Sequence, residues 1–277
     1  MKKILISAGI LIAIIIAIWL TKSPAVKPLP SPDYQNISYK IEGESITLKN
    51  GVAITEITPD SVTKKTTRYF GNSSEGDLDE DGKTDIGIIL TQDAGGSGKF
   101  YYIAVAIKTE AGYKGSNAIL LGDRIAPQNT EIRSGYLIVN YAERAQGEPM
   151  TASPSIGKSK YLILKNDILS ETPIFVESPE KNSTATSPLK ITGVAKGSWF
   201  FEASLPLLLV DASGKIIAQS HATAQGEWMT TDYVRFSGTV KFPKPTQEME
   251  ARLILKKDNP SDLPEHDDQI EIPIRLK

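Results

Sequence analysis

Residues 189–194 read Leu-Lys-Ile-Thr-Gly-Val, so that Leu189 and Ile191 alternate with polar neighbours. This period of two is typical of a strand that buries one face. Comparable stretches recur up to the C-terminus and are separated by turn-forming residues, such as those of Asp211–Lys215. The seven expected strands are Leu189–Val194, Phe200–Leu205, Leu207–Asp211, Lys215–Ala222, Arg235–Phe242, Ala251–Lys256 and Gln269–Leu276. We therefore expect an all-β sandwich over residues 189–277.

Seven short alternating strands in a region of this length are typical of an immunoglobulin-like fold. The chain has no cysteine, so the disulfide that links the two sheets in antibody domains is absent. We expect Trp199, Phe201 and Trp228 to fill the core instead.

A Pro-rich linker is expected before the sandwich, over residues 170–188. It contains Pro173, Pro179 and Pro188, with the polar run Asn182–Ser187 between them. A sandwich that already begins near Ile174 is the alternative.

The region from residue 34 to residue 169 is also expected to be rich in strands. Its expected strands are Ile37–Ile41, Ser45–Lys49, Val52–Ile57, Thr67–Phe70, Ile86–Leu90, Phe100–Ile107, Ala118–Leu121, Tyr136–Tyr141 and Lys160–Leu164. The first two flank Gly43 and predict a hairpin. A short helix around Pro59–Lys65 is compatible with the sequence, because proline is tolerated in a first helical turn. The fold class is mainly β, with α+β as the alternative for this region.

The N-terminus carries the apolar run Ile4–Leu20 behind Lys2 and Lys3. At about 1.5 Å per residue a helix over this run spans roughly 25 Å, within the range of membrane-spanning helices. The two lysines favour a cytoplasmic N-terminus, with the bulk of the chain outside the membrane. We expect residues 1–22 to be a signal-anchor helix in the cell membrane.

Residues 23–33 carry Pro24, Pro28, Pro30 and Pro32 and predict a semi-rigid spacer. The alternative for the N-terminus is a signal peptide cleaved after Ala25. In both interpretations, the rest of the chain is exported across the membrane. A lipid anchor on cysteine is excluded.

Composition limits the function classes. The net charge of −2 gives no reason to expect nucleic-acid binding. The lack of cysteine excludes disulfides, thiolate catalysis and cysteine-ligated metals. The fold must therefore be stabilised by the packing of apolar side chains, alone or together with a bound hard cation.

The sharpest local motif is the acidic stretch from Asp77 to Asp85. Carboxylates at alternate positions followed by glycine allow a tight loop to aim several oxygens at one point, as calcium requires. The expected ligands are Asp77, Asp79, Asp81, Asp85 and the carbonyl of Lys83. A complete EF-hand would need glutamate at the twelfth position, where Ile88 stands. We expect a structural Ca²⁺ loop between strands; the alternative is a solvated acidic turn.

Other motifs indicate no chemistry. Gly95–Lys99 departs from the phosphate-loop pattern and predicts a flexible hairpin turn. His221 and His266 lie in no metal spacing and are expected at the surface. Phe100-Tyr101-Tyr102 is expected to pack one face into the core, with Tyr101 as the candidate for exposure. No catalytic residue and no organic cofactor are predicted.

The C-terminal region resembles the immunoglobulin-like domain associated with bacterial spore germination. The resemblance rests on Ser178-Pro179, Ser187-Pro188-Leu189, Thr192–Ala195, Trp199–Ala203, Trp228–Thr230, Phe236, Lys257–Ser261 and Ile272–Ile274. It implies an exported β-sandwich that mediates interactions, and it supplies no established catalytic residues. The germination-protein module and the lipid-anchor cysteine that can accompany this domain are absent here.

The region before it resembles an uncharacterised extracytoplasmic bacterial module. The matching segments are Gly76–Leu78, Asp81-Gly82, Gly95–Gly98, Phe100–Tyr102, Leu120–Arg124 and Glu148–Met150. This resemblance implies no activity.

These observations predict a non-enzymatic, membrane-anchored protein of the bacterial cell envelope that binds or scaffolds an envelope protein or glycan. The alternatives are an envelope glycan or peptidoglycan hydrolase or its accessory, and an inert structural spacer.

Overall fold

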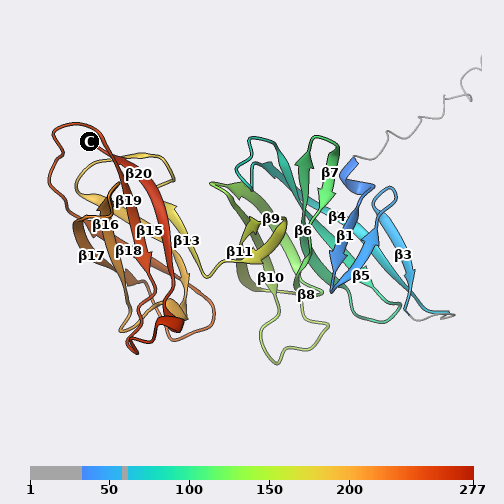
Figure 1. Ribbon diagram of the computed structural model, residues 1–277. Coiled ribbons are helices and arrows are strands. Elements are labelled where there is room, and N and C mark those ends of the chain that lie inside the picture. Colours follow the sequence, from blue (N-terminus) through green and yellow to red (C-terminus); the bar gives the residue numbers. More distant parts are fainter. Residues whose placement is uncertain (1–32, 58–61) are drawn as a thin grey trace, which may run out of the picture. The chain divides into compact units, whose positions relative to one another are not determined.

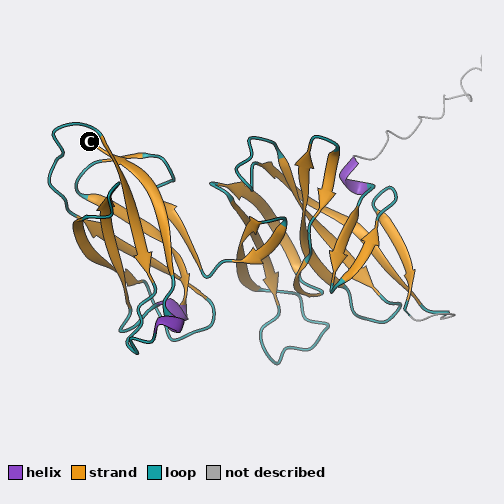
Figure 2. Ribbon diagram, viewed as in Figure 1, coloured by secondary structure: helices purple, strands orange, loops and turns teal. Residues whose placement is uncertain are grey.

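The computed structural model describes residues 33–57 and 62–277, which are mainly β (Figure 2). The helices of this part are three short 3₁₀ turns, η1 (Asp33–Gln35), η2 (Gly197–Trp199) and η3 (Pro264–His266). Within these residues no helix has the length and apolar character needed to cross a membrane. The anchor expected over 1–22 and all but the last residue of the 23–33 spacer lie outside the described residues.

The first region comprises residues 33–171, and its described residues, 33–57 and 62–171, contain twelve strands, coloured along the chain in Figure 1. They are β1 (Ser38–Ile41), β2 (Glu44–Thr47), β3 (Val52–Glu56), β4 (Lys64–Gly76), β5 (Asp85–Asp93), β6 (Phe100–Thr109), β7 (Gly112–Gly115), β8 (Ile119–Asp123), β9 (Ala126–Arg133), β10 (Tyr136–Glu143), β11 (Ile156–Lys165) and β12 (Ile168–Glu171). The helix considered around Pro59–Lys65 is not formed at Lys64 and Lys65, which begin β4 and pair with β3; residues 58–61 lie outside the described part.

Three layers build this region. The central sheet has the order β3-β4-β5-β6-β7, and β8 also pairs with β6. One face of β5 and β6 packs against the hairpin β1-β2, which confirms the hairpin predicted around Gly43. Their other face packs against the sheet β12-β11-β10-β9. Strands buried on both faces read as continuous apolar runs, which explains the sequence of β6.

The double burial of β6 corrects the expectation for Phe100-Tyr101-Tyr102. Tyr101 and Tyr102 are both buried, in the cores on opposite faces of the sheet. Phe100, at the strand end, is the exposed ring. Alternation could not reveal this, because it assumes one solvated face. The glycine-rich stretch Gly95–Lys99 connects β5 and β6, which pair as an antiparallel hairpin, as predicted.

The second region is a β-sandwich with a continuous ladder of eight strands, in the order β13-β15-β18-β17-β16-β19-β20-β14. The strands are β13 (Ile174–Ser178), β14 (Thr184–Ala185), β15 (Leu189–Lys196), β16 (Ser204–Asp211), β17 (Ile216–Ala224), β18 (Tyr233–Val240), β19 (Met249–Lys256) and β20 (Gln269–Leu276). The ladder folds onto itself, because residues from β15 and β18 share one core with residues from β16, β19 and β20.

Two expectations for the sandwich are corrected. Phe200–Leu205 and Leu207–Asp211 are not separate strands, since β16 runs unbroken from Ser204 to Asp211. Among the aromatic residues, Trp199 is buried and Trp228 packs against the core, but Phe201 is exposed and Phe200 takes its place inside. The η2 turn before Phe200 sets which of the two rings points inward.

The linker expected over 170–188 is shorter in the structure. β13 pairs with β15, and β14 pairs in parallel with β20, so the sandwich begins at Ile174. Asp33–Lys277 forms one compact unit. Within it, Phe175 of the sandwich stacks on Tyr161 of the first region with ring centroids 5.1 Å apart. A small core of Tyr136, Ile138, Tyr161, Phe175 and Val194 therefore joins the two regions.

Candidate functional sites

The acidic loop connects β4 to β5, and its position follows from the strands on either side. Gly76 ends β4 and Asp85 begins β5, while the buried side chain of Leu78 anchors the loop in the core between the two sheets. Asp85 is fully buried. Its carboxylate accepts hydrogen bonds from the backbone N–H of Leu78 at 3.0 Å and of Lys108 at 2.8 Å. Burial raises the pKa of Asp85, although these two bonds act in the opposite direction.

Three of the predicted ligands converge. Asp77, Asp79 and Asp85 each place one carboxylate oxygen within 4.8 Å of the others. The first two also accept bonds from the backbone N–H of Asp81, each at 3.1 Å, so the loop backbone orients both carboxylates. Gly82 has a φ of +83°, a conformation that glycine adopts without strain.

The fourth predicted carboxylate, that of Asp81, is instead bonded to the side chain and the backbone N–H of Lys83. Asp81 Oδ2 accepts from Lys83 Nζ at 2.8 Å, and Asp81 Oδ1 accepts from the Lys83 backbone N–H at the same distance. The bond from the Lys83 ammonium holds the pKa of Asp81 below its ordinary value. Lys83 also forms an ion pair with Glu110 at 3.3 Å. The carboxylates that converge are therefore those of Asp77, Asp79 and Asp85, and a role for the Lys83 carbonyl stays a prediction. Carboxylate oxygens are the donors that hard cations such as Ca²⁺ prefer.

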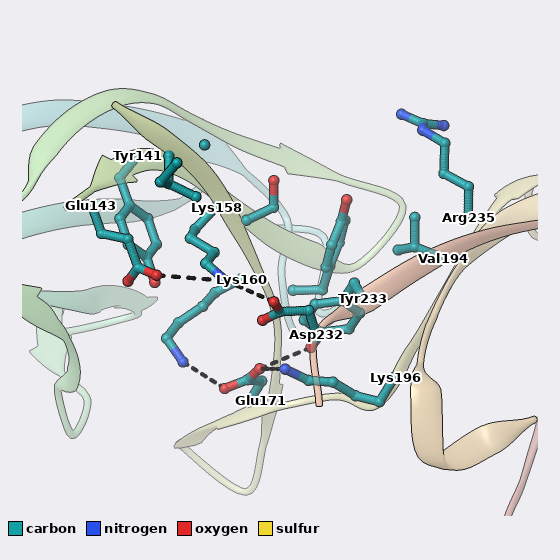
Figure 3. A pocket seen from close by; sticks show the side chains of 14 residues that line it. Tyr141, Glu143, Lys158, Lys160, Glu171, Val194, Lys196, Asp232, Tyr233 and Arg235 are labelled. Carbon is teal, nitrogen blue, oxygen red and sulfur yellow. Dashed lines mark hydrogen bonds and ion pairs between the residues drawn. The ribbon is translucent and has the colours of Figure 1, made fainter. Parts of the chain in front are cut away.

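A second candidate site is a groove of about 490 Å³ between the first region and the sandwich (Figure 3). Its lining combines four cations with three carboxylates and three tyrosines. These residues are Lys158, Lys160, Lys196, Arg235, Glu143, Glu171, Asp232, Tyr141, Tyr161 and Tyr233.

Glu171 is the centre of this groove. It accepts a hydrogen bond from Lys160 Nζ at 2.7 Å and forms an ion pair with Lys196 Nζ at 2.8 Å. The Tyr233 hydroxyl donates a hydrogen bond to Oε1 of the same carboxylate at 3.1 Å. Burial on its own would raise the pKa of Glu171, but the hydrogen bonds from the two lysines outweigh it and lower the pKa to about 2. Glu171 is thus a fixed anion.

The remaining charges of the groove are paired as well. Lys158 lies 2.7 Å from Asp232 and 3.5 Å from Glu143. The hydrogen bond to Asp232 raises the pKa of Lys158. Every carboxylate of the groove therefore has a lysine partner, and the pairs Lys158–Asp232 and Lys196–Glu171 join the two regions.

Sequence reasoning missed this groove, because its residues are spread from Tyr141 to Arg235. The one available signal is that Lys158 and Lys160 stand two residues apart on a strand. This spacing places both lysines on the same face and predicts that the face is polar, but it does not identify the residues with which they pair. The two histidines are exposed, as expected, and His266 Nδ1 lies 3.0 Å from Ser261 Oγ.

Comparison with known families concerns the sandwich. No curated protein matches the chain. The family described as the immunoglobulin-like domain of bacterial spore germination matches residues 173–262, which confirms the resemblance of the C-terminal region and agrees with a sandwich that begins at β13.

Proposed function

We propose that this chain is a non-enzymatic, membrane-anchored protein of the bacterial cell envelope that binds or scaffolds an envelope protein or glycan through its immunoglobulin-like domain. The observation that carries the proposal is the family match over residues 173–262, on a region that folds as a β-sandwich. Sandwiches of this kind present loops and sheet faces for recognition and need no catalytic group.

The charge state of the groove supports the non-enzymatic part of the proposal. A glycan hydrolase needs a pair of carboxyl groups, one of them with a raised pKa that lets it act as an acid. In this groove Glu171 has the opposite shift, to a pKa of about 2, and is held between Lys160 and Lys196. The raised pKa of Asp85 in the acidic loop belongs to a fully buried carboxylate that already accepts two backbone N–H bonds. Glu143 and Asp232 share Lys158.

Membrane attachment rests on Ile4–Leu20 with the flanking Lys2 and Lys3. The lysines would remain in the cytoplasm and place the two β regions outside. The Pro-rich spacer would then hold these regions away from the lipid surface.

We also propose a structural Ca²⁺ ion in the acidic loop, held by Asp77, Asp79 and Asp85. Three carboxylates this close repel one another, and a divalent cation between them removes the repulsion. The ion would fix the turn between β4 and β5 and has no role in a reaction.

Cross-linking in living cells tests the main proposal. A photoreactive side chain is placed at single exposed positions over the sandwich, at Lys190, Ile216 and Met229. We expect at least one position to give a reproducible adduct with one envelope component, and the adduct should saturate as the chain is overproduced. Adducts that are absent or scattered at every position would contradict a recognition role and favour the inert spacer.

A further inference from the structure

Three loops of the sandwich lie at the same end of the domain. They comprise residues 197–203, 225–232 and 257–268, and we call them together the loop surface. The strand registers next to these loops place them at one end, because the adjoining pairs are Lys196 with Tyr233, Ser204 with Thr223, Leu207 with Leu255 and Lys256 with Gln269.

The three loops also touch one another. Asp258 donates its backbone N–H to the carbonyl of Trp199 at 3.0 Å. A Cβ atom built on Gly197 would lie 2.1 Å from the carbonyl oxygen of Thr230, so the second loop packs directly on the first. In the third loop, the Asn259 side chain bonds Leu263 O and Asp267 Oδ1 and holds the turn. The loop surface is therefore one connected and internally braced surface.

Each loop exposes one large apolar side chain. Phe201 is 42% exposed, Met229 is 74% exposed and Leu263 is 46% exposed. The other exposed large apolar side chain of the sandwich is Ile216, which follows the turn at Asp211–Lys215 at the opposite end. Apolar side chains gathered on braced loops lose little conformational entropy on contact and are typical of protein interaction sites.

The charge of the loop surface selects the partner. Its single lysine is Lys257, and its eight carboxylates are Glu202, Glu227, Asp232, Asp258, Asp262, Glu265, Asp267 and Asp268. One lysine against eight carboxylates gives the three loops a net charge of −7, or −6 once Lys158, which pairs with Asp232 from the first region, is counted; the whole chain carries −2. Apart from Asp258, these carboxylates are exposed.

We propose that the loop surface docks a basic segment of a partner protein, whose apolar side chains cover Phe201, Met229 and Leu263 while its lysine or arginine residues face the carboxylates. This inference rests on the proposed function and names the surface and the chemistry of the partner. An anionic lipid surface is repelled by the same charge. Electrostatic attraction would speed the encounter, and the apolar contacts would supply most of the affinity.

A defined probe tests the chemistry. A labelled peptide of alternating lysine and leucine is titrated into the purified full-length chain, with a glutamate–leucine peptide as the control. We expect saturable binding of the basic peptide alone, weakened by salt. The double variant Met229→Ser/Leu263→Ser should bind about tenfold more weakly, which corresponds to the loss of one or two good apolar contacts. The matched control Ile216→Ser should bind as the wild type does. Equal weakening by Ile216→Ser, or no weakening by the double variant, would overturn the proposal.

Cross-linking in cells separates this inference from the function on which it rests. A photoreactive side chain at Met229 should give an adduct whose partner peptide is basic, and the triple variant Glu202→Lys/Asp262→Lys/Glu265→Lys, which leaves the Asn259–Asp267 bond in place, should abolish it. An adduct obtained at Ile216 or Lys190 but not at Met229 would overturn the loop surface and leave the recognition function intact. The absence of adducts at all three positions would overturn both. An adduct at Met229 with lipid or with an acidic peptide would overturn the loop-surface proposal alone.

Discussion

Glu171, the last residue of β12, lies 2.8 Å from the ammonium group of Lys196, the last residue of β15, and this ion pair crosses from the first region to the sandwich. Lys160 holds the same carboxylate from the other side at 2.7 Å. The ammonium of Lys196 also lies 4.0 Å from the ring centre of Tyr233, so an aromatic face completes its surroundings. Together with the stacked rings of Tyr161 and Phe175, these contacts connect the two regions.

Replacing Glu171 with glutamine should weaken this connection. The change leaves Lys160 and Lys196 close together without an anion, at a cost of about 1 kcal/mol of unfolding free energy, since solvent screens a partly exposed pair. Urea unfolding at neutral pH measures the loss. Glu177→Gln, which breaks a more exposed pair with Arg235, is the matched control and should cost less. Equal losses in the two variants would contradict a special role for Glu171.

The same pair predicts a pH dependence. The pKa of Glu171 is lowered from an ordinary value of 4.5 to about 2. A carboxylate whose folded-state pKa is depressed contributes stability above its ordinary pKa and loses it as the pH falls toward the folded value. The difference in stability between wild type and Glu171→Gln should therefore be constant near neutrality and shrink from about pH 4.5 toward pH 2. A difference that grew on acidification would show that the carboxylate is not stabilised as an anion.

Calcium binding should require the Asp79 carboxylate and should persist when the Asp81 carboxylate is removed. Calorimetry on the wild type is expected to show a Ca²⁺ site, because Asp77, Asp79 and Asp85 converge. Asp79→Ala removes one of the three converging oxygens and should abolish the heat. Asp81→Ala should retain binding, since Asp81 is paired with Lys83. Identical heats of Ca²⁺ binding in the wild type and in Asp79→Ala would contradict the proposed site.

The neighbouring rings of Phe200 and Phe201 should differ sharply in their effect on stability. Phe200 is 4% exposed and lies 6.5 Å from Phe236 between ring centres, whereas Phe201 is 42% exposed. Phe200→Ala should lower the unfolding free energy by about 3–5 kcal/mol through loss of burial and an unfilled cavity. Phe201→Ala should stay within about 0.5 kcal/mol. Thermal or urea unfolding distinguishes the two, and a reversed order would contradict the packing at η2.

Gly197 should not tolerate a side chain. Its ideal Cβ would lie 2.1 Å from Thr230 O and 2.2 Å from Trp228 O, both of which are backbone atoms that cannot move independently. Gly197→Ala should destabilise the sandwich by about 3 kcal/mol through overpacking. Gly157→Ala, at a position with nothing within 4 Å of the added carbon, is the matched control and should be close to neutral. A neutral Gly197→Ala would contradict the close contact between these loops.

Local pattern was sufficient for much of the secondary structure. The hairpin around Gly43, the strands Val52–Ile57 and Phe100–Ile107, and the turn at Asp211–Lys215 depend on side-chain alternation and on turn residues within a few positions. In that turn, Asp211 Oδ1 accepts from the backbone N–H of Ser213 at 2.9 Å, a contact within the motif itself. Side-chain alternation does not predict the strands β7, β9 and β12. Their residues alternate weakly, and their strand conformation depends on pairing with neighbouring strands.

By itself the sequence determined that this chain is mainly β, that its C-terminal region is an immunoglobulin-like sandwich, and that carboxylates gather between Asp77 and Asp85. Only the tertiary structure decided which of these carboxylates converge, that Tyr101 and Tyr102 are both buried, and that Glu171 meets Lys196. The physical reason is separation along the chain. Alternation and turn chemistry act over a few residues, whereas burial on two faces and ion pairing across two regions depend on segments that meet only after folding.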